Sequence, residues 1–321
     1  MIFGLIARRI VYLAIVIVVI TLATYFIFFA GNAQNLAARF AGHAATPQAI
    51  HDAAIRLGLN HGFWWQYWHY LVGLAHFNFG NDFQNAEPVR SELARAFPVT
   101  ASLVVGAVFF WLLIGLPIGI MSAVHPRTKR DRAGTIFALT FLSMPTFVLG
   151  VLALLVFYYY LSLAGVHFFP AAGYVPLTAD PAGWAQHLIL PWLTLALVQA
   201  AVYTRLIRSS LLDTLGEDYI RTARAKGLSR RSVIYRHGLR AALTPVVTQL
   251  GIDVGTLLAG AIVTERVFSL TGLGELSINA LFNGDLPVVA AVVLLAAVFI
   301  VVMNTIVDIA YAALDPRVRL S

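Results

Sequence analysis

The sequence predicts an all-α integral membrane protein with six transmembrane helices, and three observations favour this fold class. The chain of 321 residues has a mean hydropathy of +0.80. Only 12% of its residues are charged, whereas a soluble domain carries about 25%. Six segments are apolar over the roughly 20 residues that a helix needs to cross a bilayer. The polar remainder predicts one small helical extracytoplasmic insert rather than a second soluble domain.

The six candidate spans share a mostly apolar composition and few charges. In chain order they cover residues 10–30, 101–124, 135–163, 187–207, 243–263 and 288–314. The first span follows Arg8 and Arg9 and could instead be a cleaved signal peptide. Its apolar run exceeds the roughly 7–15 residues typical of a signal peptide, so we predict a true span.

Proline and small residues interrupt the apolar spans. Pro117, Pro145 and Pro191 each remove one helix hydrogen bond, and we expect each either to kink its helix or to be an ordinary packing irregularity. The small residues of 255–261 would allow another helix to approach the fifth span closely. Both features fit a bundle that moves and that pairs with a second membrane bundle.

The distribution of Lys and Arg predicts the orientation in the membrane. If residues 1–9 are cytoplasmic, the inner segments hold 17 of the 22 Lys and Arg residues. Membrane proteins carry such an excess on their cytoplasmic loops. We therefore predict a multi-pass protein with both termini in the cytoplasm.

Residues 31–99 form the large outer segment in this orientation. Within it, residues 48–59 (QAIHDAAIRLGL) and 62–74 (GFWWQYWHYLVGL) indicate two short amphipathic helices. The Trp and Tyr residues favour a position at the lipid headgroups. The segment can be a packing element that rests on the membrane, or a surface that receives an external partner.

The stretch 221–240 gathers seven of the 22 Lys and Arg residues. Upstream, Thr214 followed three residues later by Glu217 matches a capping box and predicts a helix start. Gly227 is placed to end that helix in a left-handed conformation, and Ser229 is placed to cap the next helix. The pattern predicts a compact helix–turn–helix elbow on the cytoplasmic face.

Four interpretations of this basic stretch compete. It can be ordinary positive charge on an inner loop, or a site for anionic lipid headgroups. Nucleic acid is excluded as a partner because no recognised nucleic-acid motif surrounds the stretch. The fourth interpretation is docking onto a cytoplasmic protein, which the glycine turn between two short helices favours.

Residues 218–247 (DYIRTARAKGLSRRSVIYRHGLRAALTPVV) resemble the coupling-loop motif of ABC importer permeases. The closest resemblance is to the B-type subunit of the dipeptide, oligopeptide and nickel subfamily, and it covers nearly the whole chain. The other similar segments include residues 265–276, 283–289 and 308–319. Arg221, Thr222 and Ala223 stand where the general motif has Glu-Ala-Ala, a departure that is similar to the peptide-type members.

This resemblance implies a type I ABC importer permease fold in the bacterial plasma membrane. The permease core would be residues 100–320, with a cytoplasmic coupling loop at 209–242. The implied partners are a homologous second permease, two ATPase domains, an extracytoplasmic substrate-binding protein and membrane lipid. The implied cargo is a dipeptide or oligopeptide, with haem or a nickel chelate as the alternative. The residues assigned to ATPase coupling are Asp218, Arg221, Ala223, Gly227, Leu228, Ser229, Arg236 and Pro245.

Asp253 is an ionisable residue within the fifth span, and such residues are functional candidates. It can line the translocation pathway, or it can pair with a neighbouring helix. Gln249, one helical turn earlier, and Glu265, near the outer end of the same helix, complete the pathway candidates. Glu265 can instead answer Arg266 or an external receptor protein.

Several kinds of chemistry are excluded by what the sequence lacks. Cysteine is absent, and the histidines show no metal-ligand spacing, so we predict no metal site. A P-loop needs a lysine after glycine, and neither Lys129 nor Lys226 follows one. We therefore expect a non-catalytic chain without a cofactor, whose partner ATPase binds ATP and Mg²⁺.

Two other protein classes remain as alternatives. A proton-coupled secondary transporter would need paired ionisable residues inside the bundle and usually an internal repeat. The sequence offers only Asp253 deep in a span and no clear repeat. A membrane enzyme would need clustered polar residues at a membrane face, and no such cluster is present in the sequence.

Overall fold

Long apolar runs that lack strand-like alternation form helices here. The computed structural model describes residues 2–27, 37–38, 46–56 and 58–314, and within them the only β-pairing is an isolated bridge between Asn81 and Pro88. Parts of the predicted first span, outer segment and C-terminus (28–36, 39–45, 57 and 315–321) lie outside these residues. The helices are α1 (Ile2–Tyr25), α3 (Pro47–Arg56), α4 (Phe63–Ala75), α5 (Val89–Val124), α6 (Lys129–Leu142), α7 (Thr146–Ala153), α8 (Leu161–Leu163), α9 (Pro181–Gly216), α10 (Asp218–Ala225), α11 (Arg230–Ser232), α12 (Leu239–Ala242), α13 (Thr244–Leu258), α14 (Ile262–Val267), α15 (Leu273–Asn283) and α16 (Leu286–Leu314), with π-helical segments η2 (Leu154–Tyr160) and η3 (Val233–Gly238).

The predicted spans fall mainly on these helices. Within the described chain, four helical runs are long and apolar enough to cross a membrane: Val89–Val124, Thr146–Leu163, Pro181–Gly216 and Leu286–Val307. A fifth span forms if the helices on either side of Leu243, which meet at 45°, are counted together. The first predicted span falls on α1, whose apolar part within the described chain is Val11–Tyr25.

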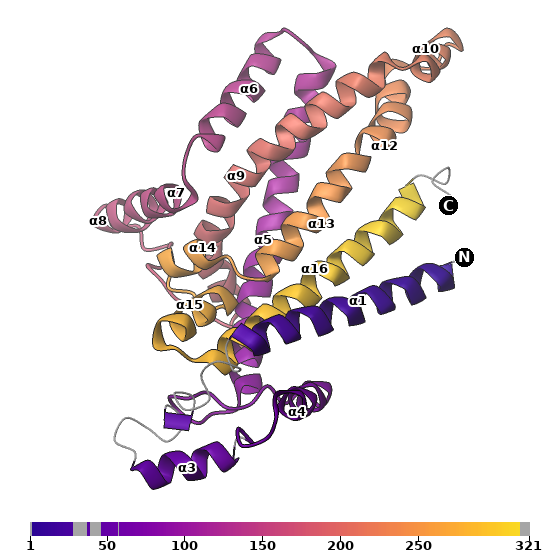
Figure 1. Ribbon diagram of the computed structural model, residues 1–321. Coiled ribbons are helices and arrows are strands. Elements are labelled where there is room, and N and C mark those ends of the chain that lie inside the picture. The colour runs from indigo at the N-terminus through magenta and orange to yellow at the C-terminus, as the bar shows by residue number, and fades with distance from the viewer. Residues whose placement is uncertain (1, 28–36, 39–45, 57, 315–321) are drawn as a thin grey trace.

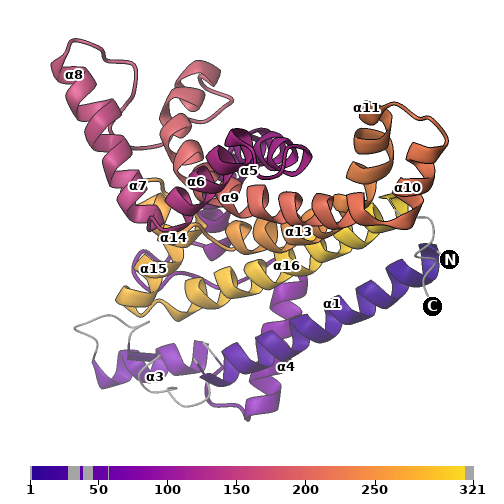
Figure 2. The ribbon, with the colours of Figure 1, turned by 90° about the horizontal axis from the view of Figure 1, so that it is seen from above.

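The third predicted span, 135–163, is divided between two helices. α6 ends at Leu142, and Pro145 is the N-cap of α7. Proline lacks a backbone donor and disfavours a helical residue before it, so the break falls at this position. α6 packs against α5 and α9, and α7 packs against α9 and α14, whereas η2 and α8 project away from the bundle in both views (Figures 1 and 2). By contrast, α5 and α9 continue through Pro117 and Pro191.

The core lies between α5 and α9, whose side chains form most of the main buried cluster. Glycines of α5 allow this approach: a Cβ on Gly115 would lie 2.8 Å from the Ala200 carbonyl oxygen, and one on Gly119 would lie 2.6 Å from that of Thr204. The fifth span uses its small residues in the same way. Gly255 packs on Ile300 of α16, where a Cβ would lie 3.2 Å from its Cα, so this glycine serves contact within the chain.

The fifth predicted span, 243–263, also ends earlier than expected. α13 stops at Leu258, and Gly260, with φ of +136°, turns the chain into α14. A Cβ on Gly260 would lie 2.7 Å from the Cα of Gly274, so both the backbone angle and the contact require glycine there. This turn brings α14 and α15 against the bundle.

The helices α3 and α4 lie at one end of the bundle, and the helices α10 and α12 lie at the other (Figure 1). We call the end with α3 and α4 the insert end, and the end with α10, α11 and α12 the elbow end. The start of α1 and the end of α16 point away from the insert end. α4 is fixed to α1 because the Tyr67 hydroxyl lies 3.0 Å from the Thr21 hydroxyl and donates to the Val18 carbonyl at 3.0 Å. Trp64 and Trp68 on α4 are exposed.

Candidate coupling elbow and buried carboxylates

The elbow, residues 217–242, begins where α9 ends at Gly216. The predicted capping box is not formed, because Thr214 lies inside α9 and donates to the Ser210 carbonyl at 2.8 Å. Threonine commonly makes this bond within helices. Glu217 is itself the N-cap of α10, and its side chain makes no capping hydrogen bond.

The turn at Gly227 has the predicted left-handed conformation, with φ of +74°. The Gly227 N–H donates to the Arg224 carbonyl at 3.0 Å, and the Leu228 N–H donates to the Ala223 carbonyl at 3.4 Å. These two bonds form a Schellman motif, which satisfies carbonyls at a helix end. No atom lies within 4 Å of a Cβ added to Gly227, so backbone conformation alone requires glycine here.

Ser229 caps the second half of the elbow, as predicted. Its hydroxyl accepts a hydrogen bond from the Ser232 N–H at 3.3 Å. α11, η3 and α12 then follow in direct succession up to Leu243, and α13 begins at Thr244 with Pro245 in its first turn. The elbow is therefore joined directly to a membrane span at each of its ends.

Apolar contacts fix the elbow to α9. Ile220, Ala223 and Val233 are buried together and pack against Leu215 at the end of α9. A Cβ on Gly238 would lie 3.1 Å from the Leu215 side chain, so η3 lies close to α9 as well. A displacement of the elbow would therefore be transmitted to α9.

The predicted coupling residues divide by exposure. Ala223 is buried within the apolar cluster, and Pro245 is half-buried. The exposed members are Asp218, Arg221, Gly227, Leu228, Ser229 and Arg236. Asp218 and Arg221 form an ion pair at 3.3 Å in which both side chains are exposed. The outer face of the elbow thus presents charged and apolar side chains to the surroundings.

A further ion pair near the elbow was not predicted from the sequence. Arg208 of α9 binds Asp131 of α6 through two hydrogen bonds, from Nε at 2.7 Å and from an Nη atom at 2.9 Å. Asp131 also accepts the Arg127 N–H at 2.9 Å. The Arg208 hydrogen bond holds the pKa of Asp131 below its usual range, although partial burial opposes this. No short sequence pattern predicts this pair, because Asp131 and Arg208 are 77 residues apart.

The structure brings two of the pathway candidates together with a third residue. Asp253 accepts a hydrogen bond from the Gln249 side-chain amide at 2.9 Å, and another from the Tyr203 hydroxyl at 2.9 Å. Gln249 and Asp253 share a face of α13, as residues four apart do. Tyr203 lies on α9 and is fully buried, and sequence reasoning missed it. The bond from Tyr203 joins α9 to α13, so Asp253 has a clear pairing role.

Glu265, the third pathway candidate, is far from this group and fully buried. One carboxylate oxygen accepts the Thr100 hydroxyl at 2.7 Å, and the other accepts the Glu275 N–H at 2.8 Å. The expected contact with Arg266 is absent, because that side chain donates to Asn279 at 2.8 Å. Glu265 thus joins α5, α14 and α15, and its side chain has no exposed surface.

Within the described residues, no group of three or more His, Asp or Glu side chains could hold a metal ion.

The sequence matches known transport proteins over most of its length. Residues 115–320 match the family described as binding-protein-dependent transport system inner membrane component, and residues 2–104 match the N-terminal family of the same system. The chain is 40% identical to the dipeptide transport system permease protein DppB of Escherichia coli (strain K12), covering 85% of this chain and 86% of that protein. It is also 40% identical to the glutathione transport system permease protein GsiC of Salmonella choleraesuis (strain SC-B67), covering 87% of each chain.

A solved structure supports the fold. A chain of the inward-facing MetNI methionine ABC transporter is similar with a TM-score of 0.55 and 21% identity, over 70% of this chain and 96% of that chain. At this identity the likeness concerns the fold alone. It shows a membrane permease fold of the kind found in type I ABC importers.

Proposed function

Because the chain belongs to the family of binding-protein-dependent transport system inner membrane components, we propose that it is the permease subunit of an ATP-driven importer of short peptides. In this family the ATPase is a separate subunit, so the chain itself is not catalytic. The similarity to dipeptide and glutathione permeases supports a cargo of two or three amino acids. Haem and nickel chelates are the cargoes that a transport assay must exclude.

The observation that carries this proposal is the construction of the elbow. It is a compact knob that is joined covalently to α9 and α13 and fixed to α9 by Ile220 and Val233. Its exposed face carries the residues that resemble the coupling motif, from Asp218 to Arg236. Closure of an ATPase that grips this face would move α9 and α13 together, and these two helices carry the bonded residues Tyr203 and Asp253.

The proposal assigns a side of the membrane to each end. The elbow end, with the coupling loop 209–242 and both termini, faces the cytoplasm, where it meets two ATPase domains. The insert end, residues 31–99, faces outward towards a substrate-binding protein. A homologous second permease completes the pathway, of which residues 100–320 form one half. We expect Gln249 and Asp253, which share one face of α13, to line this pathway.

The test is ATP-dependent peptide uptake by the reconstituted complex, with a substitution at the turn. Gly227→Val forces a β-branched residue to adopt φ of +74°, a strain of about 1–3 kcal/mol. We expect it to reduce uptake at least tenfold while the protein still inserts into the membrane. Gly216→Val is the matched control, because Gly216 also has open space around it but no positive φ.

Three outcomes would overturn the proposal. Normal uptake by Gly227→Val would remove the elbow from the mechanism. Uptake of peptide by this chain alone, without ATP, would indicate a secondary carrier. Uptake of haem or a nickel chelate in preference to di- and tripeptides would replace the cargo but keep the machinery.

A further inference from the structure

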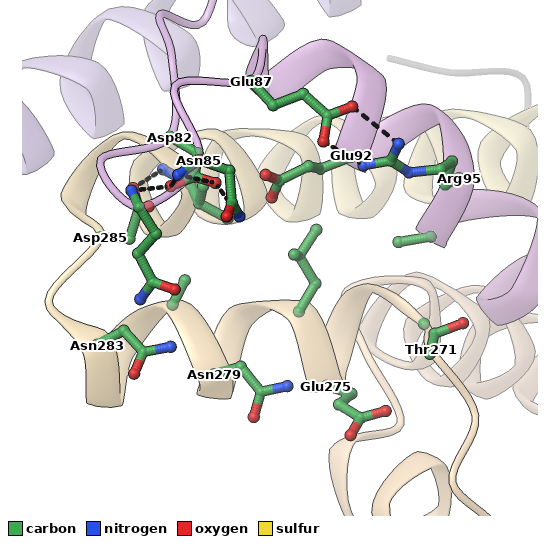
Figure 3. A pocket seen from close by; sticks show the side chains of 16 residues that line it. Asp82, Asn85, Glu87, Glu92, Arg95, Thr271, Glu275, Asn279, Asn283 and Asp285 are labelled. Atoms are coloured by element: carbon green, nitrogen blue, oxygen red, sulfur yellow. Dashed lines mark hydrogen bonds and ion pairs between the residues drawn. The ribbon is translucent and has the colours of Figure 1, made fainter.

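A cavity of about 500 Å³ lies at the insert end, between the loop 81–88, the first turns of α5 and one face of α15 (Figure 3). Its ionisable lining is mostly acidic. The residues concerned are Asp82, Glu87, Glu92, Glu275 and Asp285, with Arg95 as the cation among the lining residues. Glu87 and Arg95 pair with each other at 2.7 Å, so this cation is engaged away from the other carboxyl groups.

Two of these carboxyl groups fix the loop to the bundle. Asp82, which is 4% exposed, accepts the N–H groups of Gln84 and Asn85 from its own loop. Asp285, which is 3% exposed, lies in the turn between α15 and α16 and accepts the Phe83 N–H at 2.9 Å. That bond joins positions 202 residues apart. The loop also contains Ala86 at φ of +54°, a conformation that must be held by its surroundings.

Asp82 and Asp285 are brought together because Phe83, the neighbour of Asp82 in the chain, donates its N–H to Asp285, and both carboxyl groups are buried. Two carboxyl groups in contact can share a hydrogen bond only when one of them carries a proton. Two buried carboxylates in contact resist a second ionisation. Burial and then the bond to Asp82 raise the pKa of Asp285 to about 7. At Asp82, burial acts to raise the pKa. The bond from Asp285 and the loop N–H groups outweigh this and hold the pKa of Asp82 below its usual value.

The surrounding charges reinforce this sharing of a proton. Glu92, in the first turn of α5, adds a third carboxyl group facing Asp82. Glu275 lies across the cavity on α15 (Figure 3). Arg95 is paired with Glu87. The other hydrogen-bond donors to the two aspartates are backbone N–H groups and the Asn85 side chain. Every further ionisation therefore places like charges together.

We propose that Asp82 and Asp285 form a proton-dependent latch that holds the loop 81–88 on the α15–α16 turn and releases it as the solution becomes alkaline. The contribution of Asp285 is complete at low pH, because its protonated form is the one favoured in the fold, and it is lost as pH rises through about 7. The contribution of Asp82 needs its negative charge, so it is lost in strong acid, below about pH 4. The latch is closed between these limits.

Release of the loop would alter the entrance to the acidic cavity. The loop follows α4 and leads directly into α5, so it is the segment that connects the insert to the bundle. With the latch closed, the bridge between Asn81 and Pro88 and the Gly80–Val89 hydrogen bond complete the attachment. The latch therefore links the pH of the outer solution to the position of the insert, a role that stands independently of the cargo proposed above.

Hydrogen exchange of the full chain in lipid nanodiscs tests the latch. Exchange of peptides covering residues 80–88 is measured from about pH 5 to pH 8.5 and corrected for the intrinsic rate. As pH rises towards 7, we expect protection of the wild-type loop to fall by up to about tenfold per pH unit, because the open loop has lost a proton that the closed latch keeps, and to level off above pH 7. Asp285→Asn keeps an N–H donor for Asp82 and cannot ionise, so its protection should fall much less with pH than that of the wild type, with Glu92 as the remaining carboxyl group facing Asp82.

Three further variants complete the test. Asp285→Ala should lose loop protection at every pH, because the Phe83 N–H then lacks its acceptor. Glu275→Gln, which removes a carboxyl group of the same cavity but no bond of the latch, should keep the wild-type fall. Asp82→Asn should move the midpoint of the fall in loop protection to lower pH. This variant replaces Asp285→Asn in the test if Asp285→Asn does not insert into the membrane. The latch is refuted if wild-type protection is constant to pH 8.5, or if Asp285→Asn falls like the wild type.

Discussion

At the insert end, buried carboxylates join elements that are distant in sequence, whereas at the elbow end apolar contacts do so. Glu265 binds a hydroxyl of α5 and an N–H of α15, and Asp285 binds an N–H of the loop 81–88. The elbow instead rests on Ile220 and Val233, with its charged side chains exposed. Directional bonds specify one geometry at the insert end. Apolar attachment leaves the elbow's polar surface available for a partner.

The largest expected effect comes from removing the most deeply buried carboxylate. Glu265→Ala leaves the Thr100 hydroxyl and the Glu275 N–H without their acceptor in a site that water does not reach. We expect a loss of about 3 kcal/mol of unfolding free energy, measured by thermal unfolding in detergent. Glu265→Gln retains one acceptor oxygen and should lose less.

The control for this substitution lies one helix away. Glu275→Ala removes a side-chain carboxyl group but keeps the backbone N–H of that residue, which is the group that donates to Glu265. It should leave the melting temperature nearly unchanged. A Glu265→Ala protein that melts like the wild type would show that these bonds do not hold the insert end together.

At the elbow end, the corresponding test removes an apolar contact. Ile220→Ala opens a cavity beneath α10, at an expected cost of about 2–3 kcal/mol. Because the contact is local to the elbow, we expect hydrogen exchange to rise in residues 217–242 and to stay constant in α5. If the exchange of α5 rises as well, the elbow is not a separate unit and the comparison between the two ends fails.

Asp131 and Arg208 are the exception near the elbow end, since they form a largely buried ion pair. Asp131→Asn should cost about 1–2 kcal/mol, because Arg208 is one-third exposed and partly screened. The pKa of Asp131 is lowered, chiefly by Arg208, so its stabilisation is present above the ordinary value of about 3.9 and is lost as pH falls below it. Unfolding measured from pH 7 to pH 3 should therefore show an acid loss that Asp131→Asn lacks. Equal acid profiles would contradict this.

The sequence predicted those features that depend on neighbouring residues. Apolar length predicted the spans, and the spacing of Gly227 and Ser229 predicted the turn and the cap of the elbow. The capping box at Thr214 was predicted wrongly, because nothing before Gly216 stops α9 and threonine can bond within a helix. Local patterns fail where the continuation of a helix decides the outcome.

The pairings of Asp253 and Glu265 were beyond sequence reasoning for a different reason. Tyr203 and Asp253 are 50 residues apart, and Thr100 and Glu265 are 165 residues apart. Each pair exists because two helices pack at one register, and that register depends on close contacts such as Gly115 with Ala200. An isolated ionisable residue in a span indicates that a partner exists, but its spacing does not identify the partner.

The smallest expected effect on stability separates docking from folding at the elbow. Asp218 and Arg221 form an exposed pair, and such pairs contribute little to stability. We expect Arg221→Gln to leave the melting temperature unchanged. If the elbow surface docks onto an ATPase, the same substitution should slow association of the ATPase and make it less sensitive to salt, because rim charges act mainly on the association rate. Arg90→Gln, an exposed cation at the insert end, should change neither quantity. Equal association rates for all three proteins across salt concentrations would mean that the exposed charges of the elbow do not face a partner.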